Sequence, residues 1–140
     1  MRKIAISWLV FGLLIVAAVG LASWPGLREQ ARVRSGLRAA ELGAKLAFTE
    51  NVYRERFGAY TRDLARLGTV LEEPLPCPLE EENTVLSCPD YRYSVEEDML
   101  TAVSQADPSV YITFGLTNGR VDCSHALQAL RKEVLCSAFN

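Results

Sequence analysis

Four cysteines are the residues whose type and spacing most clearly suggest chemistry: Cys77, Cys88, Cys123 and Cys136. An even number of cysteines in a small exported domain favours disulfides. Three connectivities are possible, and we predict Cys77–Cys88 with Cys123–Cys136 because this pairing closes two short loops. A structural zinc site is the alternative, but gaps of ten and twelve residues lack the C-x₂₋₄-C spacing that such sites usually have.

Other candidates for catalysis are few. His125 is the only histidine, which excludes a site with several histidine ligands. It lies near Cys123, but a catalytic pair needs a free thiolate and an oriented base, so a surface histidine is the simpler interpretation. There is no phosphate-binding glycine loop and no G-x-S-x-G motif. The acidic run 80–82 lacks the glycine and alternating ligands of a calcium loop. We expect no enzymatic activity, no cofactor and no metal.

Charge is distributed unevenly along the chain. Residues 28–66 include nine basic and five acidic side chains, whereas residues 67–140 include four basic and twelve acidic ones. Nucleic-acid-binding proteins usually have a clustered basic face. The arginines here are spread along a predicted helix, which is typical of a solvated helix face. We expect no nucleic acid as a partner, and the sequence identifies no small-molecule substrate.

Residues Ile4 to Trp24 form an uncharged, mostly apolar run that follows Arg2 and Lys3. At about 1.5 Å per residue, such a helix can cross a bilayer core of about 30 Å. We therefore expect a membrane anchor helix over residues 1–24, with the lipid bilayer as a partner. A removable signal peptide with a weak cleavage site in residues 19–23 is the alternative, although its apolar stretch is usually only 7–15 residues long.

The orientation of this anchor depends on two conflicting signals. Lysines and arginines favour the cytoplasmic side, and the four arginines between residues 28 and 38 point to a cytoplasmic C-terminal domain. Disulfides instead require an oxidising compartment. We give more weight to the cysteines and expect a single-pass membrane protein with its C-terminal domain on the oxidising side of the membrane.

Residues 25–58 predict the exposed half of one long helix. Pro25 is expected to kink it, and Gly58 is a C-terminal capping residue. Apolar residues recur at spacings of three and four, so they share one face of the helix. These residues are Ala39, Leu42, Leu46, Thr49, Tyr53 and Phe57.

The disulfide-bearing region 59–140 predicts an α+β fold in which the long helix packs on a small antiparallel sheet. We expect a short helix capped by Thr61, an irregular loop over 68–90, and a last helix over 126–134. Alternation predicts strands over 91–95, 100–104 and 110–114. Asn118-Gly119 predicts a type I′ turn into residues 120–123, which completes a meander of three or four strands. The predicted helix-to-sheet core is Leu42, Leu46, Tyr53, Phe57, Val110, Ile112 and Phe114.

This order of features resembles type IV pilins and the pseudopilins of type II secretion, over nearly the whole length. Pilins typically have a helix-kinking proline about 22 residues into the mature chain, and Pro25 has that position counted from Ile4. Residues 58–64 are similar to the G-x-Y-x-x-D-L turn of many short pilins. The ending, with Cys123 and Cys136, resembles short pilins with two cysteine pairs.

The resemblance implies a structural subunit, a minor pilin or pseudopilin, that packs its helix against other pilin-like subunits in the membrane or a filament. A single-pass periplasmic binding module that does not assemble is the alternative. Helix association in lipid relies on close packing of small residues. The residues expected to serve the membrane and assembly helix are Gly12, Ala17, Ala18, Gly20 and Pro25.

The processing signature of the family is absent. Pilin precursors have a glycine just before the cleavage point and usually a glutamate five residues after it, and Lys3 and Trp8 occupy these positions here. The bulky side chain of Lys3 implies that prepilin peptidase neither cuts nor methylates this chain. In pilins the glutamate pairs with the N-terminal ammonium group of a neighbouring subunit within the membrane, where an unpaired charge is costly. Trp8 has no carboxylate for this pairing, which implies weak entry into filaments.

We predict that the double substitution Lys3→Gly with Trp8→Glu restores cleavage before Ile4 and entry into filaments. The measurement is the intact mass of membrane-extracted protein, together with the content of sheared filaments, in cells with a working prepilin peptidase and assembly machinery. The unmodified chain, measured alongside, should keep its anchor. Cleavage of that chain before Ile4 would show that the interpretation of Lys3 is wrong. Failure of the double variant to be cut or assembled would favour the binding module.

Overall fold

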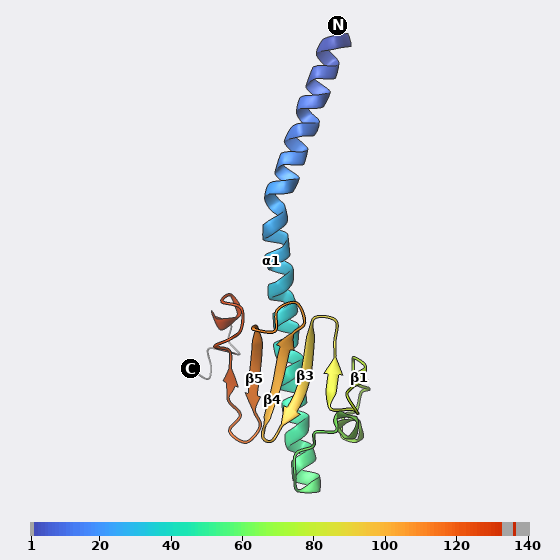
Figure 1. Cartoon of the computed structure of the whole chain (residues 1–140), viewed down its shortest axis with the longest axis vertical. Helices are drawn as coiled ribbons and strands as arrows, with labels where there is room; N and C mark the ends of the chain where they lie inside the picture. The colour runs from blue at the N-terminus through green and yellow to red at the C-terminus, as the bar shows by residue number, and fades with distance from the viewer. Residues whose placement is uncertain (1, 133–135, 137–140) are drawn as a thin grey trace. The chain divides into compact units, whose positions relative to one another are not determined.

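A computed structural model describes the backbone of residues 2–132 and 136, and the side chains of residues 12–22, 24–131 and 136. Within these residues it contains the long helix α1 (Arg2–Phe57), a six-stranded antiparallel sheet, and the 3₁₀ helices η1 (Leu64–Thr69) and η2 (Leu130–Lys132) (Figure 1). This combination is the predicted α+β class. The chain forms two compact units, residues 1–34 and 35–140.

The first unit is the N-terminal part of α1. The helix continues through Pro25, which lacks the N–H needed for one helical hydrogen bond. Among the described residues, no helix combines enough length with enough apolar character to cross a membrane. The apolar run of the predicted anchor begins at Ile4, and the side chains of residues 4–11 and 23 lie outside the described residues.

The second unit contains the sheet, whose six strands follow one another in chain order. The strands predicted over 91–95, 100–104 and 110–114 are confirmed to within one residue, and the strand after Gly119 is shorter than predicted. The strands are β1 (Leu79–Glu80), β2 (Val85–Ser87), β3 (Tyr91–Glu96), β4 (Met99–Ser104), β5 (Tyr111–Gly115) and β6 (Val121–Asp122).

Two predictions of secondary structure in this unit are wrong. The segment 68–90 is not irregular throughout, because β1 and β2 lie within it, and strands of two and three residues are too short to show alternation. Residues 126–129 are not helical, and the helical residues there are those of η2. Residues 133 and 134 of the predicted last helix lie outside the described residues.

The turn at Asn118-Gly119 is present, but it is not of type I′. That type requires positive φ at both central residues, and of the two only Gly119 has it, at 67°. The loop is longer than two residues. Gly119 N–H donates to the Gly115 carbonyl at 2.9 Å, and Gly115 N–H donates to the Arg120 carbonyl at 2.8 Å.

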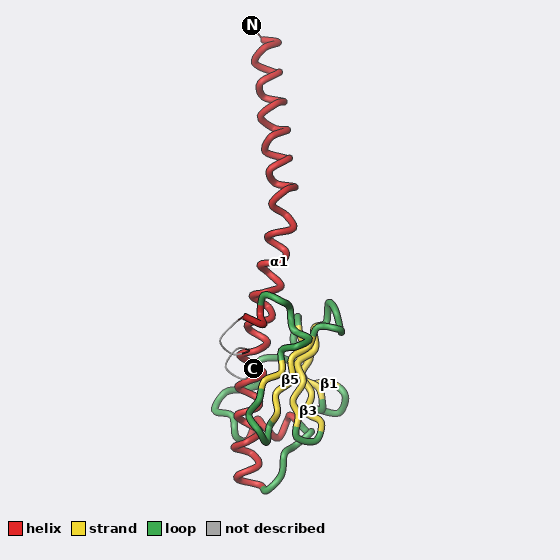
Figure 2. The backbone as a smooth tube through the Cα atoms, turned by 90° about the vertical axis from the view of Figure 1, so that its left-hand side faces the viewer, coloured by secondary structure: helices red, strands yellow, loops and turns green. Residues whose placement is uncertain are grey.

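Within the second unit, α1 packs on one face of the sheet (Figures 1 and 2). The sheet side chains alternate in burial, as a half-covered sheet requires. On β5, for example, Ile112 and Phe114 are buried, whereas their neighbours are only partly covered. The Tyr93 hydroxyl donates to the Ala39 carbonyl of the helix at 3.4 Å. The core therefore lies between one face of α1 and one face of the sheet.

Six of the seven residues of the predicted core are buried or half-buried. Its buried members are Leu46, Tyr53, Ile112 and Phe114, and its half-buried members are Leu42 and Val110.

Phe57 is the error in that core, because its side chain is 57% exposed. Figure 1 shows that α1 continues beyond the ends of the strands before the chain turns back, so the last part of the helix has no strand beneath it. Its ring instead contacts Tyr53, with 4.5 Å between ring centroids. The helix ends there because Gly58 has a φ of 88° and its N–H donates to the Arg54 carbonyl, which confirms the predicted glycine cap.

Two glycines allow α1 to approach the sheet closely. A Cβ atom at Gly43 would collide with the ring of Phe114, and one at Gly36 would collide with Leu130. Both partners are almost fully buried, so neither can move aside easily. The predicted apolar stripe included Ala39 but neither of these two glycines.

We predict that Gly43→Ala destabilises the protein by about 1–3 kcal/mol, because the added methyl group overpacks a closed core. Gly26→Ala is the matched control, since a Cβ there meets no atom within 4 Å and alanine favours a helix. Thermal unfolding of the full chain, followed by circular dichroism, should show a lower Tm for the first variant alone. Equal melting of both variants would contradict the close contact.

Candidate functional site

The exposed apolar side chains of α1 are the main surface feature of the first unit. Leu13, Val16 and Leu21 are 70–75% exposed. Contiguous apolar surface of this kind marks sites that contact a membrane or another protein. The large apolar residues exposed in this unit are Leu13, Leu14, Ile15, Val16, Val19, Leu21, Trp24 and Leu27.

The positions expected to serve helix association all lie on this exposed helix. Gly12 and Gly20 leave room for a close neighbour, because a Cβ at either position would meet no atom within 4 Å. The exposed set is Gly12, Ala17, Ala18, Gly20 and Pro25. Their placement is compatible with helix packing, and their role stays a prediction.

In the second unit, α1 also presents apolar residues on the side opposite the sheet. Phe48 is 70% exposed there. Leu37, Ala44 and Val52 share that side at helical spacing and are half-buried. This helix face and the exposed helix of the first unit therefore both present apolar side chains to a partner.

Both predicted disulfides are present. Cys77 is bonded to Cys88, and Cys123 is bonded to Cys136. The first connects the segment before β1 to the residue after β2, and the second connects the residue after β6 to the C-terminal segment. The pairing closes two short loops, which agrees with the reasoning from spacing.

The disulfide at Cys123 removes the thiol that a catalytic pair with His125 would need. His125 instead stacks on Tyr111, with ring centroids 4.4 Å apart. Its Nδ1 lies 3.0 Å from the hydroxyl oxygen of Ser124. The histidine is therefore held as a surface side chain by its neighbours.

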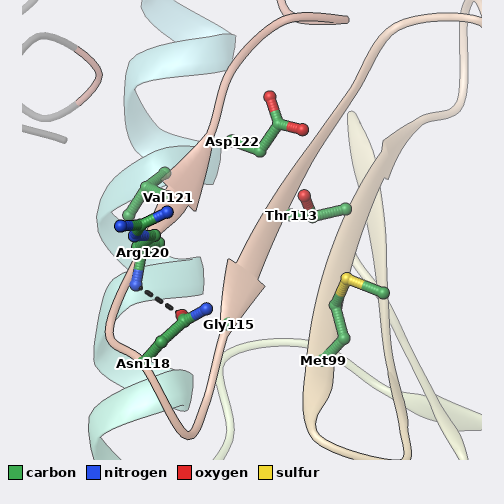
Figure 3. Close-up of a pocket in the computed structure, with 7 residues that line it drawn as sticks. All are labelled: Met99, Thr113, Gly115, Asn118, Arg120, Val121 and Asp122. Carbon is green, nitrogen blue, oxygen red and sulfur yellow. Dashed lines mark hydrogen bonds between the residues drawn. The ribbon is translucent and has the colours of Figure 1, made fainter. Parts of the chain in front are cut away.

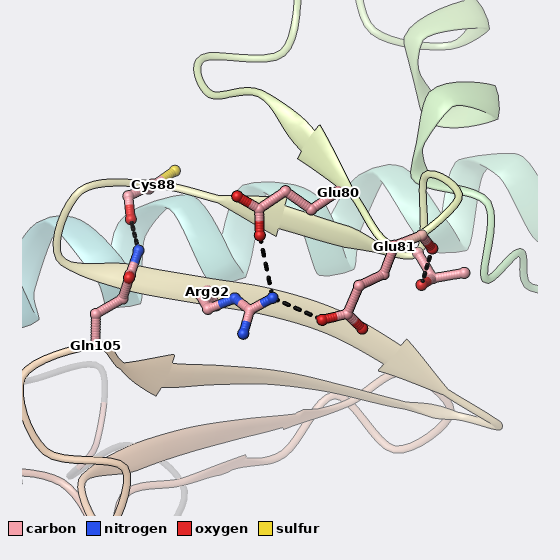
Figure 4. Close-up of polar contacts among 6 residues, drawn as sticks. Glu80, Glu81, Cys88, Arg92 and Gln105 are labelled. Atoms are coloured by element: carbon pink, nitrogen blue, oxygen red, sulfur yellow. Dashed lines mark hydrogen bonds and ion pairs between the residues drawn. The ribbon is translucent and has the colours of Figure 1, made fainter.

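The acidic run starts at Glu80, the last residue of β1, and continues into a turn that an arginine holds against β3 (Figure 4). Arg92 on β3 reaches Glu80 at 3.1 Å and Glu81 at 2.7 Å. Glu81 and Glu82 have positive φ, as residues of a tight turn. Among the described residues, no group of three or more histidine, cysteine or acidic side chains is arranged to hold a metal ion.

Glu50 is the residue that reasoning from the sequence missed. Its side chain is fully buried on the sheet-facing side of α1. Oε2 accepts a hydrogen bond from the Thr61 N–H at 3.0 Å, whereas Oε1 has no partner among the described residues. Burial raises the pKa of Glu50 to about 7, against a smaller lowering by the Thr61 hydrogen bond. The sequence did contain a signal for this burial: Glu50 lies between Leu46 and Tyr53 at helical spacing, on the same face of the helix as these two apolar residues.

The bond from Thr61 to Glu50 fastens the turn that leads from α1 to η1. The Tyr60 hydroxyl supports the same turn, since it accepts from Arg54 at 2.7 Å and donates to Asn51 at 3.2 Å. Thr61 is not the helix cap that was predicted. Its hydroxyl accepts from the Asp63 N–H, and Asp63 caps η1 by accepting from Ala65.

No protein-family model, curated protein or solved structure matches this chain.

We predict that Glu50→Gln stabilises the protein at pH 8 and has little effect near pH 4.5. The glutamine keeps an acceptor for Thr61 and removes the charge. Because the folded-state pKa of about 7 exceeds the ordinary value of 4.5, the folded state binds more protons than the unfolded state between these pH values. Wild-type stability therefore falls as pH rises through this window.

The expected gain at pH 8 is on the order of 3 kcal/mol, measured by chemical denaturation of the full chain at both pH values. Glu41→Gln is the control, since Glu41 is exposed on the same helix. A Glu50→Gln effect of equal size at pH 4.5 and pH 8 would contradict the buried-carboxylate explanation.

Proposed function

We propose that this chain is a structural subunit of the pilin-like kind, a minor pilin or pseudopilin of a type IV pilus or type II secretion system. The N-terminal part of α1 anchors it in the bacterial inner membrane, and the disulfide-bearing unit lies in the periplasm. The subunit acts by helix packing and does not catalyse a reaction. The observation that supports this best is the contrast between the two parts of α1.

In the second unit, the sheet of the same chain covers one face of α1, and this face includes glycine and alanine residues. The part in the first unit exposes leucine, isoleucine and valine side chains. Exposing such side chains to water costs about 25 cal/mol for each Å², so this part of the helix requires another cover. The uncharged sequence from Ile4 to Trp24 fits a bilayer, and small residues within it fit a neighbouring helix.

The two disulfides support export to an oxidising compartment. The turn that resembles short pilins has a structural role for each characteristic residue. Gly58 ends the helix, Tyr60 is hydrogen-bonded to α1, Asp63 caps η1, and Leu64 is fully buried. The turn therefore directs the chain from the helix to the sheet, as the resemblance implies.

We predict that the full chain is a single-pass membrane protein that contacts other pilin-like subunits through the exposed helix. It should stay in the membrane pellet after a carbonate wash, and a C-terminal alkaline phosphatase fusion should be active, because that enzyme requires the periplasm. A photo-crosslinker at Gly20 should capture pilin-like proteins of the same cell.

A photo-crosslinker at Glu29 is the matched control, because Glu29 is exposed on the same helix but carries a charge. The crosslinker at Glu29 should give less than a fifth of the crosslinked product that the crosslinker at Gly20 gives. Release by carbonate, or an inactive fusion, would contradict the anchored subunit. Anchoring without any crosslink at Gly20 would favour the periplasmic binding module that does not assemble.

A further inference from the structure

The face of the sheet turned away from α1 contains a hollow with a volume of about 370 Å³ (Figure 3). It lies over β4, β5 and β6. Thr113 and Gly115 face it, since they alternate along β5 with the buried Ile112 and Phe114. This volume is at the lower end of the range for small-molecule sites, which is about 300–1,000 Å³.

Gly115 lines the hollow. It is paired with Met99 on β4, and on its other side its N–H donates to the Arg120 carbonyl. Because Gly115 has no side chain, the side chain of Asn118 can lie over this position. A Cβ at Gly115 would collide with the side-chain oxygen of Asn118, so a larger residue is not compatible with this loop.

Two opposite charges line the hollow and are not paired with each other. Arg120 forms no ion pair among the described residues. Asp122 accepts the Ser124 N–H through Oδ1 at 2.8 Å. The hydrogen bonds from Ser124 hold the pKa of Asp122 below its usual range, so this carboxylate is charged at neutral pH.

Neutral groups complete the lining of the hollow. The Asn118 side-chain oxygen accepts the Arg120 backbone N–H at 2.9 Å, and the side-chain nitrogen of Asn118 has no partner among the described residues. It can donate to a ligand, as can the hydroxyl of Thr113. Met99 supplies apolar contact, whereas the side chain of Val121 shares the α1 face of the sheet with its partner Phe114.

We propose that this hollow binds a small zwitterion of the α-amino acid class. The ligand carboxylate contacts Arg120 and Asn118, its ammonium contacts Asp122, and its aliphatic part lies against Met99. A simple anion would face the charge of Asp122, and a simple cation would face that of Arg120. A molecule with both charges satisfies both walls, and complementary charge is what gives such a site its specificity.

The test is calorimetric titration of the full chain in a non-ionic detergent at pH 7, with L-leucine as the probe. Two derivatives each remove one charge: N-acetyl-L-leucine lacks the ammonium, and leucine methyl ester lacks the carboxylate. Saturable binding of L-leucine, with at least tenfold weaker binding of each derivative, is expected. No saturable binding of L-leucine, or equal binding of all three compounds, would overturn the proposal.

Two variants assign each charge to its partner. Arg120→Gln should weaken L-leucine binding at least fivefold and leave the weak binding of the methyl ester unchanged. Asp122→Asn should weaken L-leucine binding similarly and leave N-acetyl-L-leucine unchanged, while still accepting the Ser124 N–H. The controls are Arg62→Gln and Glu82→Gln, which are exposed outside the hollow. The assignment would be overturned if the control variants lost as much affinity for L-leucine. It would also be overturned if affinity fell only in variants with a lower Tm, because the loss would then reflect unfolding.

Discussion

Helix α1 contacts the sheet so closely that the ring of Phe114 occupies the space where a side chain at Gly43 would lie. This contact determines much of the second unit. It orients α1 so that Leu46 and Tyr53 are buried and Phe48 is exposed. A core packed at this density tolerates little change in volume, which is why small residues are required on one side and large ones on the other.

The same orientation buries Glu50, and a buried carboxylate is costly unless it is hydrogen-bonded or neutral. One backbone N–H, from Thr61, offsets part of that cost, and the raised pKa shows that burial outweighs it. The arrangement links protonation to the turn between α1 and η1. A glutamine at this position would hold the turn without the charge, so the glutamate makes the stability of this fold depend on pH near neutrality.

Small residues have different uses in the two units. In the second unit, side chains of the same chain fill the space beside Gly36 and Gly43. In the first unit, the space at Gly12 and Gly20 is open, which supports the proposal that another helix or lipid covers it. The hollow at Gly115 lies on the opposite face of the sheet from α1, so binding there and helix packing use separate surfaces. Under the proposed function, that face stays open while the helix is covered.

Local patterns in the sequence were enough to predict the long helix, its end at Gly58, the three longer strands and the disulfide pairing by loops. Each of these features depends on residues close together in the sequence. Periodicity predicts the helix and the strands, a glycine that tolerates positive φ predicts the end of the helix, and short loops predict the disulfide pairing. The short strands β1 and β2, the exposure of Phe57, the burial of Glu50 and the hollow at Gly115 could not be predicted that way. They depend on where α1 ends relative to the strands, and on which strands lie side by side. Those contacts join residues far apart in the sequence, so only the tertiary structure decides them.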